Sequence, residues 1–219
     1  MSKKKVRFLF LIVGLFLVLI FDFYILYTIN YILHKKYSNA DFGIEPYISR
    51  VDMDQDGIDD QSDILDGARE YTATNPHYQS KYYEGGYPDD QNGVCTDVVA
   101  FALLHAGYDL MNLVYEDIQE NRAAYNIETV DRNIDFRRVR NLKVYFERNA
   151  ISLTTDVFDI AEWQGGDIVI FENHIGIVSD SRNHHGVPFL IHNGSNFQRY
   201  YEEDVLETRN DIVGHYRMS

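Results

Sequence analysis

The sequence predicts an α+β domain that follows one membrane-spanning helix. An uncharged apolar stretch occupies residues 8–21, and apolar residues recur with helical spacing between residues 64 and 149. After Gly166 the pattern changes to short β-rich runs that are separated by turns. Because the helices precede the strands and do not alternate with them, we expect helices packed on an antiparallel β-sheet.

Residues 1–36 have the features of a cytoplasmic tip and a transmembrane signal-anchor. Four basic residues precede the apolar stretch, which resumes beyond Asp22 and reaches the roughly 20 residues needed to span a bilayer. Only Lys35 and Lys36 follow it, so the positive-inside rule places the N-terminus in the cytoplasm and the rest outside. We expect a single-pass protein of the cell membrane. The alternative is a signal peptide cleaved near residues 38–40, which would release a secreted protein.

The remaining chain is expected to form a linker, residues 37–51, and one extracellular domain, residues 52–219. Residues 37–219 hold 14 basic and 33 acidic residues, a formal charge of −19. This surface repels nucleic acid, which is therefore excluded as a partner. A single cysteine cannot form an internal disulfide, so its thiol is either an inert buried group or a chemically used one.

Twelve residues at the start of this domain match the calcium loop of an EF-hand. The pattern requires oxygen ligands at positions 1, 3, 5, 9 and 12, a glycine at position 6 and a backbone carbonyl at position 7. An aspartate replaces the usual glutamate at position 12, and no apolar helix of normal length precedes the loop. We expect a structural Ca²⁺ here, the alternative being an acidic cap on the next helix. The expected ligands are Asp52, Asp54, Asp56, Ile58, Asp60 and Asp63.

The expected helices and strands follow in two groups. A loop rich in tyrosine and glycine, residues 82–90, is followed by a helix from Cys95 to Ala106. Two tyrosines of this loop, Tyr83 and Tyr87, could line a substrate groove or pack as structural residues. Two more helices are expected over residues 111–123 and 133–149, and strands over residues 167–171, 174–179, 188–192 and 212–217.

Three residues form a candidate catalytic set. Cys95 opens a helix, where unpaired N–H groups and the helix dipole favour a thiolate. His174 and His192 stand on apolar β-rich runs. Each residue alone is more often part of a core, but a cysteine at a helix start followed by two strand histidines is the arrangement that a thiol hydrolase needs.

These residues also support a family resemblance. The order of the helix-borne cysteine, Gly-Asp-Ile-Val-Ile-Phe from residue 166, His-Ile-Gly-Ile-Val from 174 and Ile-His-Asn from 191 resembles the papain-like NlpC/P60 superfamily of cell-wall peptidases and amidases. Shorter blocks spread over residues 50–217 look more closely like the DUF1287 family. These blocks are residues 83–88, 93–97, 133–139, 174–178 and 214–217.

The resemblance implies a papain-like NlpC/P60-type fold and a role for each candidate. In that fold Cys95 would be the nucleophile, His174 the base and His192 the group that orients His174. The backbone N–H of Cys95 and the hydroxyl of Tyr83 would hold the oxyanion. The remaining candidates for substrate binding or oxyanion stabilisation are Tyr87, Asp97 and Arg137.

The sequence departs from the superfamily pattern beside the cysteine. Many cell-wall members have an acidic residue before it and a serine after it, which help to hold a free amine, whereas Val94 and Thr96 stand here. Asp97 lies about 200° around the helix from Cys95, so we expect it to cap or pack. Arg137 belongs to a basic run whose usual role is to form surface salt bridges, and its alternative role is to meet a substrate carboxylate.

The sequence thus favours a membrane-anchored, extracytoplasmic cysteine hydrolase that cleaves an amide bond in peptidoglycan through an acyl-enzyme on Cys95. No cofactor is expected for catalysis, and calcium would be structural. Two alternatives remain open: an acyltransferase or thioesterase on the same fold, and a cell-wall-binding module without activity.

Overall fold

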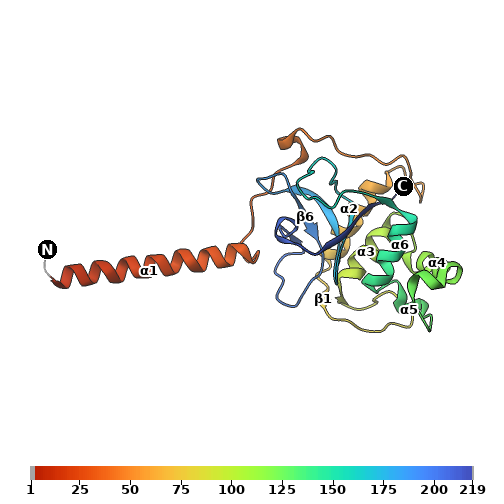
Figure 1. Ribbon diagram of the computed structural model, residues 1–219, viewed down its shortest axis with the longest axis horizontal. Coiled ribbons are helices and arrows are strands. Elements are labelled where there is room, and N and C mark those ends of the chain that lie inside the picture. The colour runs from red at the N-terminus through yellow and green to blue at the C-terminus, as the bar shows by residue number, and fades with distance from the viewer. Residues whose placement is uncertain (1–2, 219) are drawn as a thin grey trace. The chain divides into compact units, whose positions relative to one another are not determined.

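The computed structural model describes residues 3–218, which fall into two compact units divided between His34 and Lys35 (Figure 1). The first unit contains helix α1 (Lys3–Thr28), whose 26 residues carry apolar side chains on all sides. This helix is long and apolar enough to cross a membrane, and a signal sequence would have the same properties.

The second unit begins with helices and ends with strands, as expected. Three of its α-helices start at aspartate caps: Asp59, Asp109 and Asp131 each accept a hydrogen bond from a backbone N–H in the first turn. The helical elements are η1 (Asn39–Phe42), α2 (Asp60–Ala73), α3 (Cys95–His105), α4 (Leu110–Tyr125), α5 (Arg132–Asp135), α6 (Val139–Asn149) and η2 (Leu206–Thr208).

The helix expected over residues 133–149 is in fact two helices. The chain leaves the helical conformation after α5, and Arg138 is extended before α6 begins. The interruption buries the Phe136 ring in the core and turns Arg137 toward Asp97. Tertiary contacts of these two side chains therefore override the continuous helical pattern.

A six-stranded antiparallel sheet with the order β3-β8-β4-β5-β6-β7 forms the second half of the fold. The predicted α+β class and antiparallel sheet are confirmed. Two short strands, β1 (His77–Tyr78) and β2 (Asn92–Gly93), pair in parallel in a separate sheet. The strands of the large sheet are β3 (Ile151–Ser152), β4 (Ile168–Phe171), β5 (Ile175–Arg182), β6 (Pro188–Ile191), β7 (Glu202–Glu203) and β8 (Ile212–Arg217).

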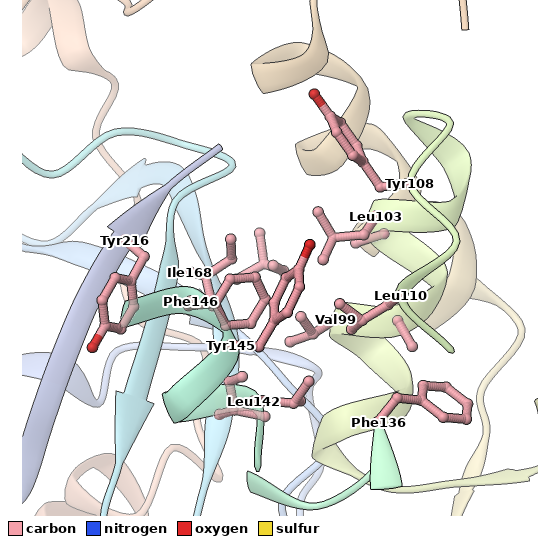
Figure 2. Close-up of a cluster of buried hydrophobic side chains, with 14 of the residues drawn as sticks. Val99, Leu103, Tyr108, Leu110, Phe136, Leu142, Tyr145, Phe146, Ile168 and Tyr216 are labelled. Atoms are coloured by element: carbon pink, nitrogen blue, oxygen red, sulfur yellow. The ribbon is translucent and has the colours of Figure 1, made fainter. Parts of the chain in front are cut away.

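Both faces of the sheet are buried, and each strand contributes to both because its successive residues point to opposite sides. Ile168 and Ile170 of β4 pack under the helices, whereas Val169 and Phe171 join a second cluster that includes Trp163. Figure 2 shows side chains of α6, among them Phe146, between those of α3 and the strands. The helical layer therefore places the start of α3 over the central strands.

The segment expected to be a linker, residues 37–51, packs on this second unit. Tyr37 and Arg182 exchange backbone hydrogen bonds at 2.8 and 2.9 Å. The Arg182 side chain is fully buried and donates to the Asn39 side chain and to the carbonyl oxygens of Trp163 and Gly186. A buried guanidinium needs several such acceptors, so these contacts hold the segment in place.

Asp167 is the centre of a buried polar network between helix and sheet. Its carboxylate accepts hydrogen bonds from the Arg217 guanidinium at 2.7 and 2.8 Å, from His215 Nε2 at 3.0 Å and from Gln61 Nε2 at 2.9 Å. Because Gln61 belongs to α2 and Arg217 to β8, the network joins the first helix of this unit to its last strand.

We predict that Asp167→Asn destabilises the protein by about 3–5 kcal/mol, because it leaves the Arg217 charge buried without its partner. Urea denaturation of the full chain in detergent measures this change through the fluorescence of Trp163, the single tryptophan, which is buried and stacked on His215. The control is Glu120→Gln, an exposed position on α4 where a change within about 0.5 kcal/mol is expected. Equal midpoints for the two variants would contradict this role of Asp167.

Candidate active site

Cys95 is the first residue of α3, and a carboxylate of the same helix fixes the turn before it. The Oδ2 atom of Asp97 accepts a hydrogen bond from the backbone N–H of Val94 at 2.7 Å. This contact caps the helix, as the position of Asp97 around the helix led us to expect. The thiol side chain is buried, with 7% of Cys95 exposed.

The same carboxylate forms a buried ion pair with Arg137. Arg137 Nε lies 2.6 Å from Asp97 Oδ1, and Nη2 lies 2.9 Å from Oδ2. Arg137 Nη1 also donates to the Lys81 carbonyl at 2.7 Å, and the Thr96 hydroxyl donates to the Arg137 carbonyl at 3.2 Å. Asp97 and Arg137, both candidates for substrate binding, therefore satisfy each other and hold the start of α3.

The two candidate histidines are in direct contact. His174 precedes β5 and His192 follows β6, so the antiparallel pairing of these strands brings the rings together. His174 Nε2 lies 2.8 Å from His192 Nδ1. His192 Nε2 lies 3.2 Å from the carboxylate of Glu203 on β7. The three side chains form a continuous hydrogen-bonded chain.

This chain determines which nitrogen of each ring carries a proton. A carboxylate only accepts hydrogen bonds, so His192 Nε2 donates to Glu203. A neutral His192 then has an unprotonated Nδ1, which accepts from the Nε2–H group of His174. The lone pair of His174 is consequently on Nδ1, which is the atom available to take a proton.

Helix α3, which Cys95 begins, packs against β5, and His174 directly precedes β5. The backbone N–H groups of Ile175, Thr96 and Cys95 itself act to lower the pKa of the thiol, so the sulfur lies near the start of β5. Ile175 directly follows His174 in the chain, so the sulfur lies near the segment that carries the imidazole. Within residues 3–218, no direct hydrogen bond joins Cys95 to either histidine. Catalytic hydrogen bonds of this kind often form only when substrate binds.

The thiol and both imidazoles are neutral near pH 7. Burial raises the pKa of Cys95 to about 11, although the N–H groups of Ile175 and Thr96 act in the opposite direction. Burial lowers the pKa of His174 to about 3, with a further contribution from His192, and lowers the pKa of His192 to about 3 as well. The thiolate expected from the helix start is absent because desolvation outweighs the helix N-terminus.

Tyr78, which the sequence did not single out, interacts electrostatically with the thiol. Its pKa is raised by burial and by the negative charge that Cys95 would carry as a thiolate. The hydroxyl of the predicted candidate Tyr83 instead donates to Asp90 at 2.8 Å, and the Arg137 guanidinium lies 5.0 Å from its ring centre. The Tyr83 hydroxyl is thus already engaged, whereas Tyr78 is close enough to the thiol for a charge on the sulfur to affect its pKa.

Tyr87 is also engaged in packing. Its hydroxyl donates to Asp109 at 3.0 Å, and its ring contacts Phe101 and Phe136. These contacts link the loop to α3 and to the interruption after α5. These contacts explain the position of the Tyr87 side chain without a bound substrate.

Asn193 joins the cysteine side of the site to the histidine side. Its buried amide donates to the carbonyl oxygens of Pro76 at 3.0 Å and of Gly93 at 3.1 Å. Gly93 lies two residues before Cys95, and Asn193 follows His192 in the chain. No sequence periodicity signals this contact, or that of Glu203, because both depend on how distant segments pair.

The acidic loop from Asp52 to Asp63 lies elsewhere. Asp54 packs against Gly107, just beyond the C-terminal end of α3. An eleven-residue helix is about 16 Å long, so α3 separates this loop from Cys95. The structure therefore does not bring the calcium candidates together with the catalytic candidates.

Comparison with known proteins identifies the family. The family model described as a domain of unknown function, DUF1287, matches residues 65–218. The chain belongs to the DUF1287 family. An uncharacterized protein, YijF of Escherichia coli (strain K12), is 40% identical over 168 residues, which cover 70% of this chain and 80% of that protein. No solved structure is significantly similar to the chain.

The DUF1287 match confirms the resemblance to that family. The matched range contains Cys95, His174, His192 and Glu203, whereas the acidic loop precedes it. The catalytic candidates therefore belong to the DUF1287 domain.

We predict that the alkylation rate of the single cysteine rises about tenfold per pH unit up to at least pH 9. A raised pKa leaves only a small thiolate fraction at neutral pH, and the thiolate is the reactive form. The measurement is iodoacetamide labelling of the full chain in detergent, followed by mass spectrometry, with Cys95→Ser as the unlabelled control. A rate that levels off below pH 7 would show a thiolate and contradict the neutral state.

We also predict that Gly194→Ala disrupts the bond between the histidines. A Cβ atom at this position would lie 3.0 Å from His192 Nδ1, the atom that accepts from His174. Long-range ¹H–¹⁵N NMR of labelled histidines should show altered ring protonation in this variant. Gly85→Ala is the matched control, since nothing lies within 4 Å of its Cβ position. Identical histidine spectra for Gly194→Ala and the parent protein would rule out this contact.

Proposed function

We propose that this protein is a membrane-anchored, extracytoplasmic cysteine hydrolase that cleaves an amide bond in peptidoglycan on a papain-like NlpC/P60-type fold. The observation that carries the proposal is the chain His174–His192–Glu203, together with a cysteine that begins a helix packed against β5. A nucleophile, a base and a group that orients the base are the parts that covalent catalysis requires.

The first half of the reaction forms an acyl-enzyme. His174 Nδ1 takes the thiol proton while Cys95 Sγ attacks the amide carbonyl carbon, giving a tetrahedral intermediate with a negatively charged oxygen. The Cys95 backbone N–H, at the first position of α3, and the Tyr78 hydroxyl are the candidate donors to this oxygen. His174 then passes the proton to the departing amine as the C–N bond breaks, which leaves a thioester.

The second half returns the enzyme to its starting state. His174 Nδ1 takes a proton from water while the water oxygen attacks the thioester carbon. The C–S bond breaks, the sulfur regains the proton and a carboxylic acid leaves. His192 and Glu203 remain bonded throughout and keep the proton of His174 on Nε2, so that Nδ1 can act as base.

The neutral state of the site favours general-base catalysis over a preformed ion pair. With the pKa of Cys95 at about 11 and that of His174 at about 3, an isolated thiolate and imidazolium are unfavourable before substrate binds. Proton transfer in this mechanism accompanies carbon–sulfur bond formation. The oxyanion donors then stabilise charge only when it develops.

Two other features support the location and the substrate class. The basic residues at the N-terminal end of α1 favour an outward-facing domain if this helix stays in the membrane. Peptidoglycan as the substrate rests on the resemblance of the cysteine and histidine blocks to NlpC/P60 cell-wall enzymes. The acidic composition of the domain argues against a nucleic acid as partner.

The test is incubation of the purified full chain in detergent with peptidoglycan fragments, followed by mass spectrometry. We expect products in which one water has been added and one amide bond lost. Cys95→Ala should abolish turnover, and His174→Ala should lower kcat by about 10²–10⁴-fold through loss of the base. Gly85→Ala, with open space at its Cβ position, should retain activity.

Other outcomes separate the alternatives. Transfer of the acyl group to an acceptor other than water would identify an acyltransferase. Fragment binding without products, unchanged in Cys95→Ala, would identify a binding module and overturn the hydrolase proposal. Full activity in Cys95→Ala would exclude this site from the reaction.

A further inference from the structure

We propose that the loop from Asp52 to Asp63 binds one calcium ion, at a site distinct from the candidate active site. The loop precedes the residues that the DUF1287 model matches. It is therefore a feature of this chain outside the matched domain. The inference does not depend on the proposed hydrolase activity.

Three exposed carboxylates form the outer part of the site. One oxygen from each of Asp52, Asp54 and Asp56 can be chosen so that all lie within 4.8 Å of one another. The backbone permits this through left-handed conformations at Gln55 and Gly57, with φ of 64° and 97°. Exposed acidic groups often lie this close without an ion, so this cluster is not sufficient evidence by itself.

A buried carboxylate supplies independent evidence. Asp63 in the first turn of α2 is 2% exposed, and its Oδ2 atom has no hydrogen-bond partner in the described chain. A buried acceptor without a partner is costly and rare in folded proteins. A cation at this point would give the oxygen the partner that it lacks.

Asp63 stands at position 12 of the loop, the position of the last EF-hand ligand, and is close enough to the exposed cluster to be affected by its charges. Burial is the main reason that the pKa of Asp63 is raised to about 6, and the charges of Asp56 and Asp54 are the next causes. Asp63 is not among the residues whose oxygens lie within 4.8 Å of one another, so an ion held by all four carboxylates would draw it toward Asp52, Asp54 and Asp56. Such an all-oxygen site suits calcium, whereas magnesium usually binds through one or two carboxylates and retains several waters.

Asp60, expected as a ligand at position 9, instead accepts hydrogen bonds from two groups of the protein. Its carboxylate accepts from the Met53 backbone N–H at 2.7 Å and from the Tyr108 hydroxyl. It therefore fastens the loop to the turn after α3. Position 9 of an EF-hand loop often reaches the ion through water, so this arrangement is compatible with the site.

The site also explains how an ion would stabilise the domain. Asp63 belongs to α2, whereas Asp54 packs against Gly107 after α3. Helices α2 and α3 approach closely at Gly67, where an added Cβ would lie 2.5 Å from the Cβ of His105. An ion bound by Asp54 and Asp63 would therefore link α2 to the C-terminal end of α3, whereas Cys95 lies at the N-terminal end of α3.

The experiment is titration of the calcium-stripped full chain in detergent at constant ionic strength, first with Tb³⁺ luminescence and then with CaCl₂ as competitor. We expect one Tb³⁺ per chain, displaced by Ca²⁺ with Kd of about 10⁻⁴–10⁻³ M, the range of extracellular modules. The Tm followed by Trp163 fluorescence should rise with Ca²⁺ and saturate, and Mg²⁺ should raise it less.

Matched variants locate the ion. Asp54→Asn, at an exposed position, and Asp63→Asn should each weaken binding at least tenfold, whereas Asp66→Asn, exposed on α2 outside the loop, should bind as the parent does. Absence of saturable binding, or equal binding by Asp54→Asn and the parent, would overturn the proposal. Cys95→Ala should bind calcium normally, so failure of the hydrolase proposal leaves this test intact.

Discussion

The buried ion pair between Asp97 and Arg137 is the interaction on which the geometry of the candidate site depends. Asp97 stands two residues after Cys95 in α3, and its carboxylate also accepts from the Val94 N–H that begins the helix turn. In a medium of low dielectric, each charge would be costly without the other. The pair also explains the interruption between α5 and α6, since a continuous helix would not turn Arg137 toward α3. One contact thus determines both where the nucleophile stands and how the helical layer is divided.

Much of the fold followed from local pattern, because hydrophobic periodicity is a property of neighbouring residues. The positions of α3, β4 and β8 could be predicted in this way, and so could the antiparallel sheet. The family assignment was recognisable from the sequence for the same reason, since it rests on contiguous blocks. The contact between His174 and His192 was also foreseeable, because two strand histidines on an antiparallel pair can meet at one end.

The remaining parts of the site depend on contacts between distant segments, and no sequence period reports these. Glu203 reaches His192 only because a two-residue strand pairs with β6. Tyr78 belongs to another two-residue strand, so no sequence period distinguishes it from Tyr83 in the neighbouring tyrosine-rich loop. The pKa of the thiol shows the same limit. The sequence shows that Cys95 stands at a helix start. It does not show how deeply the thiol is buried, and burial decides whether the pKa of the thiol is raised or lowered.

A buried, protonated thiol also has a consequence for chemical durability. Peroxide oxidation and disulfide exchange both proceed through the thiolate, so a sulfur with a pKa of about 11 reacts slowly with oxidants at neutral pH. Since Cys95 is the single cysteine, no second thiol in the chain could reduce a sulfenic acid by forming a disulfide with it. Damage would therefore have no repair route within the molecule, and burial is what keeps the sulfur reduced.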